Sequence, residues 1–212
     1  PVLVIGRIHA HTVGGGVGLA CAVDIAYAHE KASARLSELA IGIGPFVVGP
    51  AVERKVGTGI FGLLSASPAL RREADWCVQR GLYAEIFPTI EALDARIDAH
   101  TKELAAYSPE AMAELKRVMW KGTEDWDQLL IERAKISGRL VLSDFTREAI
   151  AKFKAAMDSG KHKARVEKDA EVANKAGVSR TPSFVINGYY ISGAQPISAF
   201  KKVINRAMKE AK

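Results

Sequence analysis

The sequence has only two cysteines, Cys21 and Cys77, and they are far apart. It has no CxxC pair, so it lacks the two thiols that disulfide exchange requires. Such sparse cysteine is typical of a chain that stays reduced in the cytoplasm. No Cys or carboxylate stands at ligand spacing near His9 and His11, and we therefore expect no metal site. On a single strand these two histidines would point the same way, as solvated or hydrogen-bonded groups.

Long apolar runs, a signal peptide, internal repeats and nucleic-acid motifs are also missing, so we expect neither a membrane span nor a nucleic-acid partner.

The charged residues are unevenly distributed along the chain. Residues 1–154 contain 19 basic and 19 acidic side chains, which leaves 11 basic and 5 acidic ones for residues 155–212. Because both signs alternate along an amphipathic pattern in that tail, we interpret it as a solvated helix face. The hydrophobic fraction of 48% is sufficient for a packed core.

The most informative feature that is present is the glycine triplet Gly14-Gly15-Gly16. An apolar-rich strand leads toward it and a helix of small residues begins there. Free N–H groups and the positive end of the helix would therefore point into the turn, where they could stabilise an oxyanion. The spacing does not match GxGxxG, and no Lys-Ser/Thr pair follows as in a Walker A loop. A carboxylate, Glu38, comes shortly before the Gly/Pro-rich stretch 41–46.

The pattern along the chain predicts an α/β fold. We expect strands at about 2–8, 24–28 and 82–88. We expect helices at about 15–22, 48–56, 58–65, 68–80, 89–106, 109–120, 124–138 and 144–157. Ser108 before Pro109 has the character of a helix N-cap followed by proline at the first helical position.

Three separated strings resemble the crotonase (enoyl-CoA hydratase/isomerase) superfamily: GGGVGLACAVDIAYA at 14–28, SELAIGI at 37–43 and GPAVERKVG at 49–57. The likeness covers about residues 1–154 and is greatest to the branch that includes methylglutaconyl-CoA hydratases. It implies a partial crotonase-type ββα superhelix with a helical C-terminal region that forms a homo-oligomer, a trimer or hexamer. Because Pro1 falls in the middle of the family pattern, we expect the N-terminal half of the fold to be missing, and with it the second oxyanion donor.

The resemblance also implies roles for individual residues. The N–H of Gly15 would donate to the thioester oxyanion, and Glu38 would transfer the proton. Substrate contacts are expected at Gly14, Gly16 and Pro45. Coenzyme A enters as the thioester substrate, and no cofactor is implied. The family's first catalytic glutamate falls on Gly18, so only one carboxylate remains, which suits an isomerase or a hydratase that has lost or relocated one group.

The last stretch, about residues 155–212, resembles the C-terminal part of a DsbA-like thioredoxin-fold protein. The string GVSRTPSFVINGYYISG at 177–193 predicts a strand at 184–186, a turn at Asn187-Gly188 and a return strand at 189–191. A charged helix would precede it and a final helix would follow. The resemblance places Thr181 and Pro182 at the cis-proline position, while the half that would carry the CxxC pair is absent.

Three functions remain open at this point. The first is an acyl-CoA enzyme that transfers a proton at an enoyl thioester. The second is a thioredoxin-like redox or binding module. The third is a catalytically inactive hybrid or assembly protein. The two resemblances also leave open whether the chain is a natural fusion, an engineered hybrid or a fragment.

Overall fold

The computed structural model describes residues 2–160, 163–175, 183–186, 189–192 and 195–210. The chain divides into two compact units, Pro1–Ala151 and Lys152–Lys212. Across the described residues, no helix combines the length and the apolar character needed to span a bilayer.

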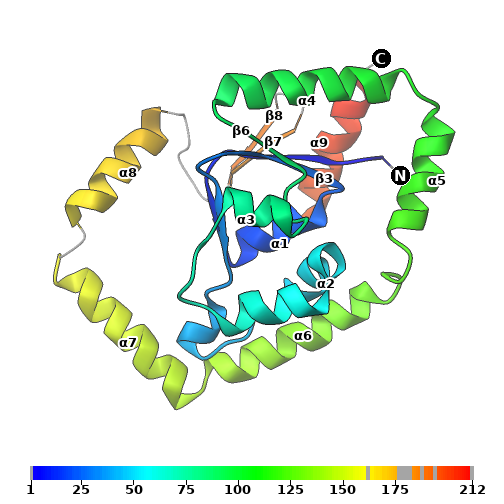
Figure 1. The fold of residues 1–212 in the computed structure, drawn as a ribbon. Coiled ribbons are helices and arrows are strands. Elements are labelled where there is room, and N and C mark those ends of the chain that lie inside the picture. The colour runs from blue at the N-terminus through cyan, green and yellow to red at the C-terminus, as the bar shows by residue number, and fades with distance from the viewer. Residues whose placement is uncertain (1, 161–162, 176–182, 187–188, 193–194, 211–212) are drawn as a thin grey trace. The chain divides into compact units, whose positions relative to one another are not determined.

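Two small sheets form the centre of the first unit (Figure 1). In one, the parallel strands β1 (Ile5–Ile8), β3 (Ile25–His29) and β6 (Glu85–Phe87) lie in the order β1-β3-β6. In the other, β2 (His11–Val13) pairs parallel with β4 (Ser33–Arg35), which pairs antiparallel with β5 (Arg72–Glu73). The chain bends between His9 and His11, so these histidines do not share one strand, and the prediction that they point the same way from it is wrong.

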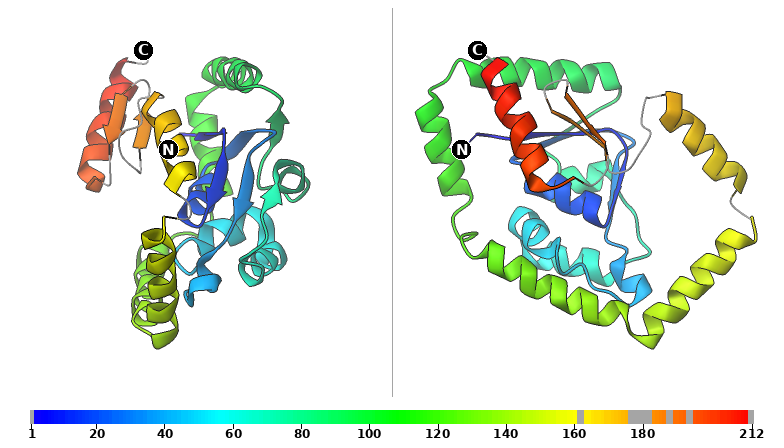
Figure 2. Two further views of the ribbon diagram at one scale, coloured as in Figure 1. Left: turned by 90° about the vertical axis from the view of Figure 1, so that its left-hand side faces the viewer. Right: turned by 180° about the vertical axis from the view of Figure 1, so that it is seen from behind.

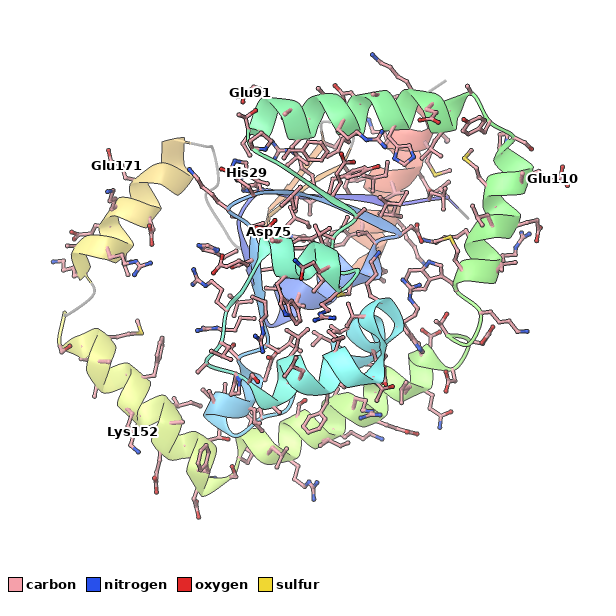
Figure 3. All side chains as sticks on the ribbon, in the orientation of Figure 1. His29, Asp75, Glu91, Glu110, Lys152 and Glu171 are labelled. Atoms are coloured by element: carbon pink, nitrogen blue, oxygen red, sulfur yellow. The ribbon has the colours of Figure 1, made fainter. Side chains whose placement is uncertain are left out.

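The helices, in chain order, are α1 (Gly15–Ala22), the 3-10 helix η1 (Glu38–Ile41), α2 (Gly49–Ala66), α3 (Ala74–Gln79), α4 (Ile90–Ala105), α5 (Pro109–Met119), α6 (Trp126–Val141) and α7 (Asp144–Asp158). Helices α1, α3 and α4 make the main contacts with the two sheets. On α4, Leu93 is fully buried while Glu91 projects outward, as does Glu110 on α5 (Figure 3). The core joins α1, α2, α3 and both sheets, with Val17, Cys21, Leu36, Val52 and Leu64 among its members.

The sequence predicted most of these elements, and Ser108 caps α5 by accepting a hydrogen bond from the N–H of Ala111 at 3.3 Å. Two expectations need correction. The first strand begins at Ile5 rather than at residue 2, and β2 was missed because the chain turns at residues 9–10 before it. The predicted helix 68–80 begins only at Ala74, because the preceding residues pair with β4 as strand β5.

A break inside α2 separates the two helices that the sequence predicted at 48–56 and 58–65. Gly57 has φ 77° and ψ 161°, a conformation that is essentially restricted to glycine. The break changes the direction of the second half of α2, which carries Phe61 and Ser65. Helix α6 runs beside α2 (Figure 2), and residues of both helices line one cavity.

A buried carboxylate ties α5 to the start of the sheet. Asp24 accepts hydrogen bonds from the Lys116 ammonium at 2.6 and 2.8 Å, from the Trp120 indole N–H at 2.6 Å and from the Val4 N–H at 2.6 Å. Its side chain is fully buried. Burial favours the neutral acid, but these three donors outweigh it and lower the pKa of Asp24.

The second unit contains the remainder of α7, then α8 (Lys163–Lys175), β7 (Ser183–Ile186), β8 (Tyr189–Ser192) and α9 (Ile197–Glu210). As the sequence predicted, the two strands pair antiparallel, with residue 184 opposite residue 191. A two-stranded pair beside a helix does not by itself make a thioredoxin fold. The turn Asn187-Gly188 and the cis-proline candidates Thr181 and Pro182 lie outside the described residues.

We predict that Gly57→Ala lowers the free energy of unfolding by about 1–3 kcal/mol, because alanine strains the Gly57 backbone conformation. Gly59→Ala is the matched control, since Gly59 is helical and a Cβ there would meet open space. That variant should be stabilised by about 0.5–1 kcal/mol. Urea unfolding of both variants measures the difference. Equal effects at the two positions would contradict the assigned break.

We also predict that Asp24→Asn lowers the free energy of unfolding at pH 7 by about 3–5 kcal/mol, because it leaves the Lys116 ammonium without its buried partner. A carboxylate with a lowered folded-state pKa stabilises the fold above its unfolded pKa of about 3.9. This contribution is lost as the pH falls through the folded-state pKa, so the difference between wild type and variant should shrink in acid.

The control is Asp94→Asn, which removes an exposed ion pair with Arg7 and should cost less than about 1 kcal/mol. Thermal unfolding between pH 3 and pH 8 measures both variants. A constant difference between wild type and Asp24→Asn over this range would exclude the ionised carboxylate as its source.

Candidate functional site

The glycine triplet forms a tight turn that leads into α1, as the sequence predicted, although the strand before it is β2 and not the predicted 2–8. Gly14 has φ 53° and ψ −115°, and its N–H donates to the Arg35 carbonyl at 2.9 Å. The N–H groups of Val17 and Gly18 donate back to the Gly14 carbonyl. Within the described part of the chain, no acceptor is found for the N–H of Gly15 or of Gly16. These two donors lie at the positive end of α1 and are available to an anionic oxygen.

The structure brings the Glu38 carboxylate directly to this turn. A Cβ on Gly14 would lie 3.0 Å from Glu38 Oε1, so the absence of a side chain there is what admits the carboxylate. Glu38 Oε2 is buried and has no hydrogen-bond partner among the described residues. Burial raises the pKa of Glu38, although backbone N–H groups of Glu38 and Ser37 oppose the shift. A half-buried carboxylate with a raised pKa is suited to taking up and returning a proton.

The segment after Glu38 is held in place by the corner between α6 and α7. Gly42 has φ 81°, and a Cβ there would lie 2.6 Å from the Phe145 ring and 2.8 Å from Thr146 Oγ1. Thr146 is fully buried, and its hydroxyl donates to the Leu140 carbonyl at 3.1 Å. This close packing fixes the segment that follows Glu38.

Gly18 is buried where α1 meets the start of α2. A Cβ on Gly18 would lie 2.8 Å from the Val48 Cβ, which leaves no room for a side chain. A glutamate at this position would therefore displace Val48. Val48 also lines the Glu38 cavity, so the site has one carboxylate from these two positions rather than a pair.

Glu38 lines a small cavity that shares wall residues with a neighbouring one. Its own cavity, of about 120 Å³, is lined by Pro45, Phe46 and Ser137 among others. Pro45 and Phe46 also line a second, apolar cavity of about 330 Å³. Pro45 thus lines both cavities, and its place beside a substrate stays a prediction.

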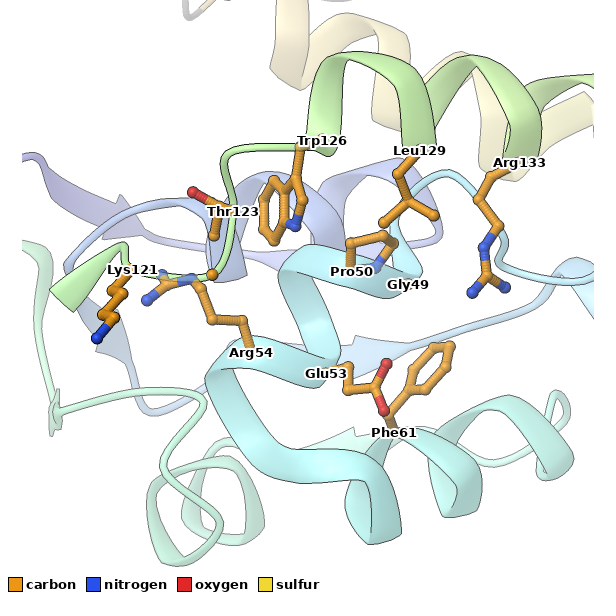
Figure 4. A pocket seen from close by; sticks show the side chains of 11 residues that line it. Gly49, Pro50, Glu53, Arg54, Phe61, Lys121, Thr123, Trp126, Leu129 and Arg133 are labelled. Carbon is orange, nitrogen blue, oxygen red and sulfur yellow. The ribbon is translucent and has the colours of Figure 1, made fainter. Parts of the chain in front are cut away.

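Arg133 is a residue of this region that the sequence reasoning missed. It lines the apolar cavity and also a third one, of about 300 Å³, between α2 and α6 (Figure 4). A signal was present in the sequence, because Arg133 follows Trp126 and Leu129 at helical spacing and so falls on their apolar face.

Neither cysteine and no described histidine lines these three cavities. Cys21 and Cys77 are free and buried, and burial raises the pKa of each thiol to about 12. His11 is hydrogen-bonded, with Nδ1 2.8 Å from Ser33 Oγ and Nε2 3.0 Å from an Arg71 nitrogen. In the described residues, no three His, Cys, Asp or Glu side chains gather as metal ligands would.

Comparison with known proteins gives a consistent result. The family model described as enoyl-CoA hydratase/isomerase matches residues 1–171. An enoyl-CoA hydratase from Mycobacterium avium is 27% identical, with a TM-score of 0.65 over 72% of this chain and 59% of that one. No curated protein gave a significant match.

Two more distant structures support the fold alone. An enoyl-CoA hydratase from Mycobacterium avium subsp. paratuberculosis K-10 is 24% identical, with a TM-score of 0.64 over 73% of this chain and 63% of that one. An enoyl-CoA hydratase from Bacillus halodurans is 20% identical, with a TM-score of 0.62 over 68% of this chain and 58% of that one. The chain thus spans less than two thirds of the length of these solved relatives.

The family match extends past residue 154 to residue 171, so most of α8 belongs to it rather than to a DsbA-like segment. Neither the family model nor these structures supports the methylglutaconyl-CoA branch or a DsbA-like C-terminal part. Because this family model matches residues 1–171, most of the chain, the chain belongs to the enoyl-CoA hydratase/isomerase (crotonase) family.

Proposed function

We propose that this protein transfers a proton at an enoyl-CoA thioester. The observation that carries the proposal is the approach of the Glu38 carboxylate to the glycine turn, within 3.0 Å of the Cβ position of Gly14. The N–H of Gly15 donates to the thioester oxygen as it gains negative charge. Glu38 takes a proton from the carbon next to the thioester, which leaves an enolate held by that N–H.

In isomerisation, Glu38 returns the same proton to the far carbon of the former double bond, so the double bond shifts and no other reactant is consumed. Hydration would need a second group to hold the attacking water. Because Val48 fills the space beside Gly18, the site favours isomerisation among these two reactions. Gly14 and Gly16 contribute by letting backbone and substrate approach, and Pro45 by lining the exit from Glu38.

A homo-oligomer, trimer or hexamer, is part of the proposal. Large apolar side chains are exposed along α5, α6 and the first part of α7: Leu115, Val118, Ile131, Leu142, Phe145 and Ile150. Their exposure supports burial against another copy of the chain. A thiol–disulfide activity has no such support, because both described thiols are buried and protonated at neutral pH.

We predict that Glu38→Gln lowers the kcat for isomerisation of a 3-enoyl-CoA by about 100-fold or more, because the amide cannot accept the proton. Ultraviolet assays with a 3-enoyl-CoA and with crotonyl-CoA measure both candidate reactions. Glu110→Gln is the control, since Glu110 is exposed on α5 and should leave turnover unchanged. Full activity in Glu38→Gln would remove Glu38 from the mechanism. Failure of the wild type to bind any acyl-CoA would favour a catalytically inactive assembly protein.

A second prediction compares two glycines of the turn. Gly14→Ala places a methyl group 3.0 Å from Glu38 Oε1 and strains a positive φ, so activity should fall by about 100-fold or more, to the level of a lost proton-transfer group. Gly15→Ala adds a methyl group to open space and keeps the N–H, so it should lose about tenfold at most. Kinetics with folding checked by circular dichroism separate the two. Equal losses would contradict the assigned contact between Gly14 and Glu38.

A further inference from the structure

Helix α6 carries an arginine within its inward stripe. The other half-buried side chains of this helix are apolar or small: Trp126, Leu129, Leu130, Ile136, Ser137 and Leu140. Arg133 is half-buried among them and has neither an ion pair nor a side-chain hydrogen bond within the described part of the chain. The Arg133 nitrogens are not among the buried side-chain atoms that lack a partner, so they are accessible to a ligand that enters the cavity.

Arg133 lines the apolar cavity of about 330 Å³, whose walls are otherwise made of Leu39, Gly44, Pro45, Phe46, Phe61, Gly62, Ser65 and Ala66. The Ser65 hydroxyl already donates to the Phe61 carbonyl at 2.7 Å. Among the described side chains of this wall, Arg133 is therefore the one whose N–H groups lack an acceptor.

The apolar cavity connects Arg133 to the proton-transfer site through shared walls. Gly44, Pro45 and Phe46 line both this cavity and the one that contains Glu38. A hydrocarbon chain that starts at Glu38 would pass these residues and reach Arg133. Between Glu38 and Arg133 these shared walls are largely apolar, which suits a hydrocarbon chain better than the amide groups of the pantetheine arm of coenzyme A.

Beyond Arg133 the charge is predominantly positive. The third cavity is lined by Arg54, Lys121 and Arg133, with Trp126 and Leu129 between them in Figure 4. The Arg54 guanidinium is held 3.9 Å above the Trp120 ring, and its Nε is buried without a partner among the described residues. The carboxylate in this lining, Glu53, accepts a hydrogen bond from Thr58 at 2.6 Å. The lining of this cavity thus contains three cationic side chains and one carboxylate, and that carboxylate already accepts a hydrogen bond.

From this arrangement we propose that Arg133 binds a carboxylate at the far end of the acyl chain. The substrate class is a coenzyme A thioester of a dicarboxylic acid, with its thioester at Glu38 and its free carboxylate at Arg133. This inference rests on the proposed function and adds the identity of the acyl group to it.

Calorimetric binding of two matched pairs of saturated thioesters tests the inference without turnover: glutaryl-CoA against valeryl-CoA, and adipyl-CoA against hexanoyl-CoA. The members of each pair differ only in the terminal carboxylate. Wild type should bind one or both dicarboxylyl thioesters about 10- to 100-fold more tightly than the neutral partner, as expected for hydrogen bonds to a charged group. Arg133→Gln should abolish this preference and leave the affinity for the neutral thioesters unchanged.

Arg139→Gln is the matched control, because Arg139 lies on the exposed side of α6 and outside these cavities. It should retain the full preference. Arg133→Lys keeps the charge without the planar fork and should retain part of it, which gives a second measure if Arg133→Gln fails to fold.

Equal binding within both pairs by the wild type, or a preference that survives in Arg133→Gln, would overturn this inference alone. Equal weakening of all four thioesters in Arg133→Gln would also overturn it, because Arg133 would then contact the coenzyme A part. Failure of all four thioesters to bind the wild type would overturn the proposed function itself.

Discussion

The absence of a side chain at Gly14 is the constraint on which the site depends. The chain turns there from β2 into α1, and the Glu38 carboxylate occupies the space that a Cβ would need. The same turn leaves the N–H of Gly15 without an acceptor in the described structure. One local feature therefore brings unpaired N–H donors and a carboxylate to the same turn. The arrangement leaves Glu38 Oε2 buried without a hydrogen-bond partner among the described residues, which is unfavourable for folding. Buried polar atoms of this kind often have a functional role.

The rest of the first unit holds this arrangement and shapes what can enter it. Asp24 binds Lys116 and Trp120 and so anchors α5 to the start of the sheet. Helix α6 follows α5 and supplies Ser137 to the Glu38 cavity and Arg133 to the apolar one. The break at Gly57 sets the direction of Phe61 in the opposing wall. The walls of these cavities thus depend on how α5 and α6 are held in place.

Local patterns in the sequence predicted much of this. The glycine triplet followed by small residues indicated α1, and the break between two predicted helices at Gly57 is present. Strand β4 and the short β5 could not be predicted, because pairing between residues far apart in sequence defines them and their own composition does not. The same applies to Asp24, whose partners follow about 90 residues later.

For the site, the sequence placed Glu38 and the glycines by resemblance, and the geometry shows that they meet. It did not identify Arg133, whose position in a cavity wall depends on how α6 packs beside α2. The thioredoxin-like resemblance was carried by residues 177–193, many of which lie outside the described ranges. Two paired strands were predicted there, but a strand pair is shared by many folds, so it could not identify one.

Proton exchange at the carbon next to the thioester is the most direct test of the central claim that the Gly14 turn and Glu38 form a proton-transfer site. Butyryl-CoA dissolved in D₂O with the protein can be followed by proton NMR, with no need for hydration or isomerisation. The account predicts loss of the C2 proton signal with the wild type and no loss with Glu38→Gln. Exchange that proceeds equally fast in both proteins, or in neither although butyryl-CoA binds, would contradict it.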